Sequence, residues 1–206
     1  MKAIIFIDFD NFCNSVKEAN PDRREKVGSF AKFIVKHLSE KGILQISLQD
    51  VLRTYVYTGE FTDSLITRIR KQGNEFQGIL DYAIKQQIWQ KKFFDIAIGF
   101  ESFEVRTKPL QFEKGKIFQK GIDVQIAVDM IAHSYNNSCD VVILCSGDVD
   151  LIESIKLVKS LGKKVVICSA WKTSAKNIRK EADIFIDFTK LQKEDLDLFT
   201  VVHNSK

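Results

Sequence analysis

Two apolar segments that each end in carboxylates constrain most strongly what this chain can fold into. They are IIFIDFDN at residues 4–11 and VVILCSGDVD at residues 141–150. Short, continuous apolar runs of this kind are typical of parallel strands buried on both faces. In an open α/β sheet, ligands bind beyond the carboxyl ends of the strands, where the strand order reverses. If the two strands are neighbours, these carboxylates meet in one small volume: Asp8, Asp10, Asp148 and Asp150.

Carboxylates gathered in one place repel one another, so a cluster of them needs protons or a divalent cation to be stable. A metal-dependent enzyme is therefore the leading hypothesis from these segments. The aspartates also have an ordinary alternative. Asp8 and Asp10 stand in a strand-to-helix turn, and Asp150 directly precedes an expected helix, which are positions where Asp commonly caps a helix.

Two further places carry polar residues: the turn around Gly147, and the start of a helix expected at 122–135. Ser146 and Asp148 flank Gly147, and the missing side chain of a glycine lets the backbone approach a ligand closely. Asp123 falls in the first turn of the expected helix, where the helix dipole stabilises an acid with or without a metal.

The order of apolar and polar stretches predicts an α/β fold. Strands are expected at 3–8, 53–58, 140–145, 164–168 and 183–187, with one or two more in 93–107. Helices are expected at 21–41, 62–89 with a break near Gly73–Gly78, 122–135, 151–161, 174–181 and 190–199, and a basic connection at 108–120. Strands that alternate with helices favour a three-layer α/β/α sandwich with a largely parallel central sheet. We expect a single domain over 1–206, with a core at 3–188 and a helical tail at 189–206.

Composition narrows the class of protein. The 206 residues are 45% hydrophobic, yet no apolar run approaches the roughly 20 residues that span a bilayer, and no signal peptide is recognisable. We therefore expect a cytoplasmic protein without a membrane partner. The net charge is +4, and the surface is more basic than this total suggests if the aspartates gather in one cleft. A basic surface around an acidic pit suits a phosphate-backbone substrate.

The four cysteines lack the spacing of a metal or redox site. Cys13, Cys139, Cys145 and Cys168 form no CxxC pair, and two of them lie in strand-like apolar runs. We expect reduced, structural thiols.

Several stretches together resemble the NYN domain of the PIN-like nuclease superfamily, which includes the bacterial LabA-like proteins. The most specific are QKGIDVQIAVDM at 119–130 and DVVILCSGDVDLIESIKLVKSLGKKVVI at 140–167. The opening IFIDFDNF at 5–12 is similar to the first strand of that family, and EADIFIDF at 181–188 falls in the expected order. The resemblance implies a PIN-like fold and cleavage of RNA, single-stranded or structured, with Mg²⁺ or Mn²⁺.

The resemblance also implies roles for individual residues. The implied catalytic metal ligands are Asp8, Asp123, Asp148 and Asp150. The implied substrate-side residues are Asn11, which supports the first aspartate, Lys120, which meets a phosphate, and Ser146, which orients a ligand or a water. Arg106 is a further basic residue that we expect to hold the RNA backbone.

Two positions depart from the family pattern. The glycine that follows the first aspartate in the family is Phe9 here, and the next residue is Asp10. Phe9 either crowds the substrate or stacks on a base. Asp10 either adds a ligand or points to solvent.

The expected chemistry is metal-assisted hydrolysis of a phosphodiester, with hard oxygen ligands that favour Mg²⁺ or Mn²⁺ over zinc. One alternative is an RNA-binding or regulatory NYN module with weak or no catalysis. Another is a phosphatase of the haloacid-dehalogenase type, whose nucleophile motif the DFD at 8–10 resembles, although Phe12 stands where that motif has Thr or Val. Residues 60–92 fit a substrate-facing helix or a homodimer contact equally well.

Overall fold

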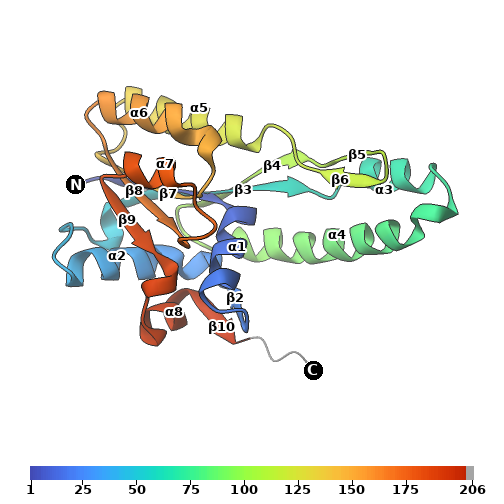
Figure 1. Cartoon of the computed structure of the whole chain (residues 1–206), viewed down its shortest axis with the longest axis horizontal. Helices are drawn as coiled ribbons and strands as arrows, with labels where there is room; N and C mark the ends of the chain where they lie inside the picture. The colour runs from blue at the N-terminus through green and yellow to red at the C-terminus, as the bar shows by residue number, and fades with distance from the viewer. Residues whose placement is uncertain (203–206) are drawn as a thin grey trace.

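A six-stranded, fully parallel sheet forms the centre of the molecule (Figure 1). The computed structural model describes residues 1–202 of the chain. The spatial order of the strands is β4-β3-β1-β7-β8-β9, and each neighbouring pair is parallel. Their bounds are β1 Ala3–Asp8, β3 Val51–Glu60, β4 Phe103–Pro109, β7 Val141–Cys145, β8 Lys164–Ser169 and β9 Ile184–Asp187.

Helices cover both faces of this sheet, which confirms the expected three-layer α/β/α sandwich. One face packs against α1 (Phe9–Ala19), α2 (Phe30–Glu40) and α8 (Lys193–Phe199). The other face packs against α5 (Ile122–Tyr135), α6 (Ile152–Ser160) and α7 (Lys176–Glu181). Short 3₁₀ helices occur at Val27–Ser29, Leu48–Asp50, Asn74–Phe76, Val149–Leu151 and Phe188–Lys190.

Strand β1 shows why its sequence is apolar without alternation. All six of its residues are buried. Successive side chains point to opposite faces of a sheet, so Ile5 and Ile7 join the cluster that includes Phe12 of α1, while Ile4 and Phe6 join the cluster under α5. A strand covered on both faces needs apolar residues at every position.

A second body of structure, which we call the arm, extends away from the sheet (Figure 1). The arm consists of α3 (Asp63–Arg70), α4 (Gln77–Ala97) and the antiparallel hairpin of β5 (Gln111–Glu113) with β6 (Lys116–Phe118). It has a small hydrophobic cluster of its own, whose buried members are Leu65, Ile66, Ile69, Leu80, Ala83 and Phe112.

The C-terminal part of the described chain is packed against the body. Strand β10 (Thr200–Val202) pairs antiparallel with β2 (Arg23–Glu25). Arg23 is 3% exposed, and its guanidinium contacts the Asp197 carboxylate at 2.6 Å and donates to Thr200 Oγ1 at 2.8 Å. The last four residues of the expected tail, 203–206, lie outside the described residues.

The expected helix at 21–41 is wrong in its first half. The chain forms α1 directly after β1, then β2, and only then α2. The periodic apolar residues after Val27 do lie in a helix, α2, but Val27 itself lies in the short 3₁₀ helix before it. Pro21 is therefore not in the first turn of a helix, since it lies between α1 and β2.

The expected strand signal at 93–107 is partly wrong. Helix α4 continues to Ala97, so only Phe103–Pro109 is a strand. An apolar run such as FFDIAI is ambiguous between helix and strand when periodicity alone is considered. The connection at 108–120 also contains the β5–β6 hairpin, which the sequence analysis did not predict. None of the described helices has the length and apolar character needed to cross a membrane.

Truncating Phe199 should destabilise the whole fold, because α8 is anchored in the main core. Phe199 is 0% exposed, and its ring centroid lies 4.4 Å from that of Phe33 and 5.3 Å from that of Phe188. We expect Phe199→Ala to lower the free energy of unfolding by about 3–5 kcal/mol. Urea denaturation measures this, with Val202→Ala as control because Val202 is 61% exposed. Equal stabilities of the two variants would contradict the prediction.

Candidate active site

The two acidic segments are neighbours in the sheet, which is the condition under which their carboxylates were expected to meet. Strand β1 pairs with β7 in a register that places Ile7 opposite Cys145. The next residues, Asp8 and Ser146, therefore leave the sheet side by side. The chain builds β3 and β4 on one side of β1 and then returns to build β7, β8 and β9 on the other. The two segments thus end at the point where the strand order reverses, which is the usual ligand site of such folds.

Asp8 is buried at this edge and held by three donors. It is 2% exposed. Asn11 donates its backbone N–H to Oδ1 at 3.3 Å and its Nδ2 to Oδ2 at 2.6 Å. Ser146 Oγ donates to Oδ2 at 3.2 Å. Asp8 is the N-cap of α1, the ordinary role considered for it, and its role as a metal ligand stays a prediction.

Ser146 connects Asp8 to the second acidic segment. Its hydroxyl accepts a hydrogen bond from the Asp148 backbone N–H at 3.2 Å. Asp148 Oδ1 in turn accepts from the Asp150 backbone N–H at 3.0 Å, so Asp148 rather than Asp150 caps the turn at Val149–Leu151. This series of bonds fixes the geometry of the loop.

Gly147 is required for a different reason from the one expected. A Cβ at this position would lie 2.5 Å from the Thr173 carbonyl oxygen and 2.6 Å from Ser174 Cα. The close approach that glycine permits here is thus to the chain after β8. The Ala175 N–H donates to the Gly147 carbonyl at 3.1 Å in the same contact.

Three carboxylates converge in front of this edge. Asp123, in the first turn of α5, joins Asp148 and Asp150, and one ligand oxygen from each lies within 4.8 Å of the others. Gly121 precedes α5 with a φ of +83°, a backbone conformation that favours glycine. Asp8 is outside this group of three, although the charge of Asp123 acts on it.

The electrostatics reflect the crowding of acids. Burial raises the pKa of Asp8 to about 6, and the neighbouring charges of Asp10 and Asp123 add to the effect. The pKa of Asp123 is also raised, first by burial and then by the charges of Asp148 and Asp150. A divalent cation relieves repulsion of this kind. Three hard oxygen donors so close together fit Mg²⁺ or Mn²⁺ in chemical type.

The two basic residues singled out from the sequence differ in their surroundings. Lys120 is exposed and lies three residues before Asp123. Arg106 pairs with both Asp129 of α5 and Glu104, the latter at 2.8 Å, and lies over the Tyr55 ring at 4.0 Å. The substrate-binding roles of both residues stay predictions.

A polar network under α5, which the sequence analysis did not find, contains Arg106. Tyr57 donates to Asp129 Oδ2 at 2.8 Å, and the hydroxyl of Tyr55 is 3.0 Å from His133 Nε2. The network ties the helix that carries Asp123 to β3 and β4. Tyr55 and Tyr57 are two residues apart in β3 and therefore lie on the same face of the sheet. This spacing was the one sign of the network in the sequence.

Phe9 does not stand free in the site. It is 7% exposed, and its ring centroid lies 5.9 Å from that of Trp89 and 5.6 Å from that of Phe93, both on α4. The side chain that replaces the family glycine therefore connects β1 to the arm. Asp10 is exposed beside it.

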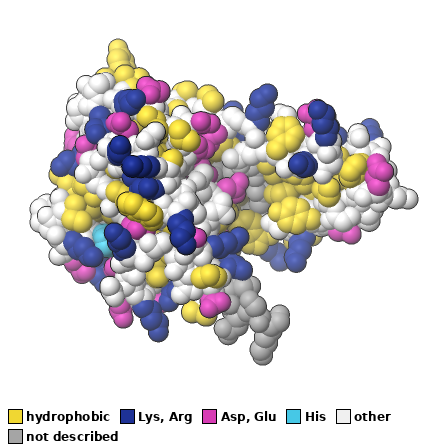
Figure 2. Space-filling view, viewed as in Figure 1, with side chains coloured by type: hydrophobic (Ala, Val, Ile, Leu, Met, Phe, Trp, Pro, Cys, Tyr) yellow, Lys and Arg dark blue, Asp and Glu magenta, His cyan; other side chains and the backbone are white. Residues whose placement is uncertain are grey.

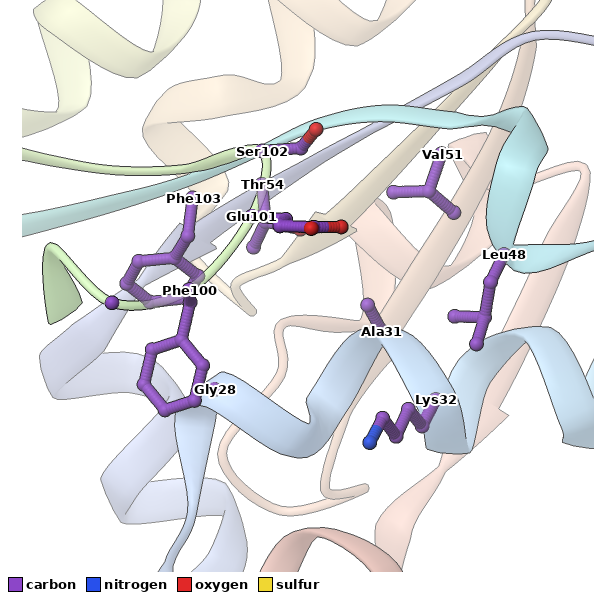
Figure 3. A pocket seen from close by; sticks show the side chains of 11 residues that line it. Gly28, Ala31, Lys32, Leu48, Val51, Thr54, Phe100, Glu101, Ser102 and Phe103 are labelled. Atoms are coloured by element: carbon purple, nitrogen blue, oxygen red, sulfur yellow. The ribbon is translucent and has the colours of Figure 1, made fainter.

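A separate cavity of about 330 Å³ lies at the other edge of the sheet (Figure 3). Val51 and Thr54 from the first half of β3, Phe103 at the start of β4, and Lys32 of α2 are among its lining residues. Because these strands begin where β1 and β7 also begin, this cavity is remote from the carboxyl edge and does not belong to the acidic site.

Comparison with known proteins identifies the family. The pattern of the NYN domain matches residues 2–192. This chain is an NYN domain. A crystal structure of a protein of unknown function from Vibrio parahaemolyticus RIMD 2210633 has the same fold, with a TM-score of 0.63 and 21% identity over 97% of this chain and 96% of that one. No curated protein matches the chain. The more specific LabA-like assignment stays a prediction.

The raised pKa of Asp8 predicts how the stability of this NYN domain depends on pH when divalent ions are chelated. Between the ordinary pKa of 3.8 and about 6, the folded state keeps a proton that the unfolded state has released. The contribution of Asp8 to stability is therefore full below about pH 4 and is lost as the pH rises through 6.

Wild type should lose up to about 3 kcal/mol of unfolding free energy through Asp8 over this range, whereas Asp8→Asn should lose less. Urea denaturation in a chelator, at several pH values, measures both slopes. Superimposable profiles for the two proteins would refute the assignment.

Proposed function

We propose that this NYN domain is a ribonuclease that uses Mg²⁺ or Mn²⁺ to hydrolyse RNA phosphodiester bonds. The observation that carries the proposal is the convergence of Asp123, Asp148 and Asp150 within 4.8 Å, beside the buried Asp8, at the reversal point of the sheet. Membership of the NYN family supports the same chemistry, because the family resembles PIN-like nucleases.

Asp123, Asp148 and Asp150 are the residues that would hold the cation, with Asp8 behind them. A bound Mg²⁺ or Mn²⁺ supplies charge that polarises a phosphoryl oxygen and lowers the pKa of a water. Asn11 and Ser146 keep Asp8 in one orientation through three hydrogen bonds. Such fixed orientation places charge where it is needed without reorganisation during the reaction.

Lys120 supplies positive charge for the substrate. Its side chain is exposed, and it lies three residues before Asp123 in the loop that leads into α5. An ammonium group in this place attracts a phosphate without competing for the metal, since Lys carries donors only. Arg106 contributes indirectly, because its pairing with Asp129 helps to hold α5.

The alternatives are less well supported. Phe9, the reason for considering an RNA-binding module without catalysis, packs toward the arm, so it is no argument against turnover. A phosphatase would need Asp8 as an accessible nucleophile, and Asp8 is 2% exposed and held by Asn11 and Ser146. Cytoplasmic location and homodimer formation stay predictions.

Replacing Asp148 should abolish cleavage while preserving the loop, because the Oδ1 of an asparagine can still accept from the Asp150 N–H. We expect Asp148→Asn to reduce the rate of Mn²⁺-dependent RNA cleavage about 100-fold or more. Single-stranded and structured RNA are incubated with each protein, with and without Mn²⁺, and the products are separated on gels. Asp22→Asn, an exposed acid remote from the edge, is the control. Binding without metal-dependent cleavage by the wild type would overturn the proposal.

Metal binding should also be visible without any substrate. A cation that binds only the folded state at about 100 times its dissociation constant stabilises by about 2.7 kcal/mol. We expect Mn²⁺ to raise the unfolding free energy of wild type and Asp22→Asn equally, and that of Asp150→Asn much less. Asp150 and Asp22 are both exposed, so the two variants test position rather than loss of charge. Equal stabilisation of all three proteins would exclude Asp150 as a ligand.

A further inference from the structure

A second cavity adjoins the acidic site, between the arm and the carboxyl edge of the sheet. Its volume is about 270 Å³. From the body it is lined by Phe9, Asp10 and Thr58, and from the arm by α4 and the hairpin. Asp10 is two residues beyond Asp8, so one end of the cavity reaches the acidic edge.

Exposed aromatic rings line the arm side of this cavity. Tyr82, Gln86 and Trp89 are four and three residues apart on α4, a spacing that puts them on one side of a helix. Tyr82 is 53% exposed and Trp89 is 44% exposed. On the face shown in Figure 2, hydrophobic side chains gather on the arm next to a group of acidic side chains on the body.

The Trp89 ring is held firmly. The Trp89 and Phe93 rings stack with 1° between their planes at a centroid distance of 5.5 Å. Gln90, which is 5% exposed, donates from Nε2 to the Gly59 carbonyl at 2.6 Å and accepts from the Phe61 N–H at 2.9 Å. Both ends of one amide therefore fasten α4 to the end of β3. Rigid, exposed rings lose little freedom on binding a flat ligand.

The cavity also has an unpaired acceptor. Gln119 lines it, and Gln119 Oε1 is buried without a hydrogen-bond donor among the described residues 1–202. A buried acceptor that lacks a donor is costly, so turning the Gln119 amide into the cavity, where a ligand N–H group can supply the missing donor, is favourable. The edges of nucleobases carry such groups. Gln119 is followed directly by Lys120, the predicted phosphate contact.

The charge of this part of the chain suits a polyanion. The stretch from Phe61 to Lys120 has eleven Lys and Arg against seven Asp and Glu, so it carries a net +4 while the rest of the chain is neutral. An aromatic surface set among positive charges is the usual form of a single-strand binding site, in which bases stack on rings and the backbone follows the cations.

We propose that this cavity binds one unpaired base of the RNA, stacked on Trp89 and Tyr82, and directs the adjoining phosphate to the acidic cluster. This inference rests on the proposed ribonuclease function and extends it to a preference for unpaired segments. A paired base has both faces covered by its neighbours, so it cannot stack in the cavity. The volume, close to the lower end of small-ligand cavities at about 300 Å³, suits one ring system.

Binding is tested on an Asp148→Asn background in a chelator, so that hydrolysis plays no part. Trp171→Phe removes the only other tryptophan and leaves Trp89 as the reporter. We expect a short single-stranded RNA to quench its fluorescence, and the same oligomer with abasic sites to leave it unchanged. An RNA duplex should bind more weakly. Quenching by the abasic oligomer to the same extent would overturn the stacking assignment.

Variants separate stacking from general packing. Fluorescence anisotropy of labelled RNA should show Trp89→Ala and Tyr82→Ala weakening single-strand binding at least about fivefold, because stacking contributes strongly for each base. Trp89→Phe keeps a ring and should retain most of the affinity. Ile88→Ala is the matched control, since Ile88 is 53% exposed on the same helix and is absent from the cavity lining. Equal affinities for all variants would refute the proposal.

The outcomes also distinguish this inference from the proposed function. Base-dependent quenching without Mn²⁺-dependent cleavage by wild type would support the cavity and reject the nuclease. Cleavage by wild type, with unchanged RNA binding in Trp89→Ala and Tyr82→Ala, would support the nuclease and reject the cavity. Sedimentation velocity is run on the same proteins. If Trp89→Ala turns a dimer into a monomer while RNA binding stays unchanged, the surface contacts a second copy and the inference fails.

Discussion

The pairing of β1 with β7 is the constraint on which the site depends. The register that puts Ile7 opposite Cys145 makes Asp8 and Ser146 emerge together, and the Ser146 hydroxyl then joins both acidic segments. A shift of one residue would turn every side chain of β1 to the opposite face. Because both faces are filled by different hydrophobic clusters, such a shift is strongly disfavoured. Core packing thus fixes the position of a carboxylate that takes no part in the core.

The fold tolerates its concentrated negative charge at a cost. Burial raises the pKa of Asp8, and the neighbouring acids raise that of Asp123 further. Groups whose ionised form is disfavoured in the folded state reduce stability near neutral pH, and a strained arrangement of this kind is typical of functional sites. The hydrogen bonds from Asn11 act in the opposite direction, since they stabilise the ionised form of Asp8. Burial and hydrogen bonding thus act in opposite directions on the ionised form of Asp8, and burial is the larger effect.

Much of the fold could be predicted from the sequence, because strands and helices follow from the local pattern of apolar and polar residues. Much of the site could not, because it depends on contacts between distant segments. The helix at Ile122–Tyr135 and the strands that carry Asp8 and Asp148 follow from periodicity, apolar runs and flanking glycines. Helix α1 was missed because Phe9 and Phe12 continue the apolar run of β1, and periodicity cannot separate such segments. The strand ends pointed to Asp148 and Asp150, whereas Asp123, on α5, was expected in the cluster only from the family resemblance. The roles of the Gln90 amide and the Trp89 ring could not be predicted, because they depend on contacts that α4 makes with the end of β3 and with Phe9.

Two glycines show how closely other parts of the chain approach the carboxyl edge of the sheet. Gly147 admits the chain at Thr173 and Ser174, where a Cβ would meet backbone atoms at 2.5 and 2.6 Å. Gly59 admits Leu110, which connects β4 to the arm; a Cβ at Gly59 would lie 2.3 Å from Leu110 Cδ2 and 3.0 Å from Gln119 Oε1. Backbone atoms cannot move aside as a flexible side chain can, so the first contact is the more rigid of the two. The second places the Leu110 side chain and the Gln119 amide against the end of β3, so this contact adds to the Gln90 hydrogen bonds that join the arm to the sheet.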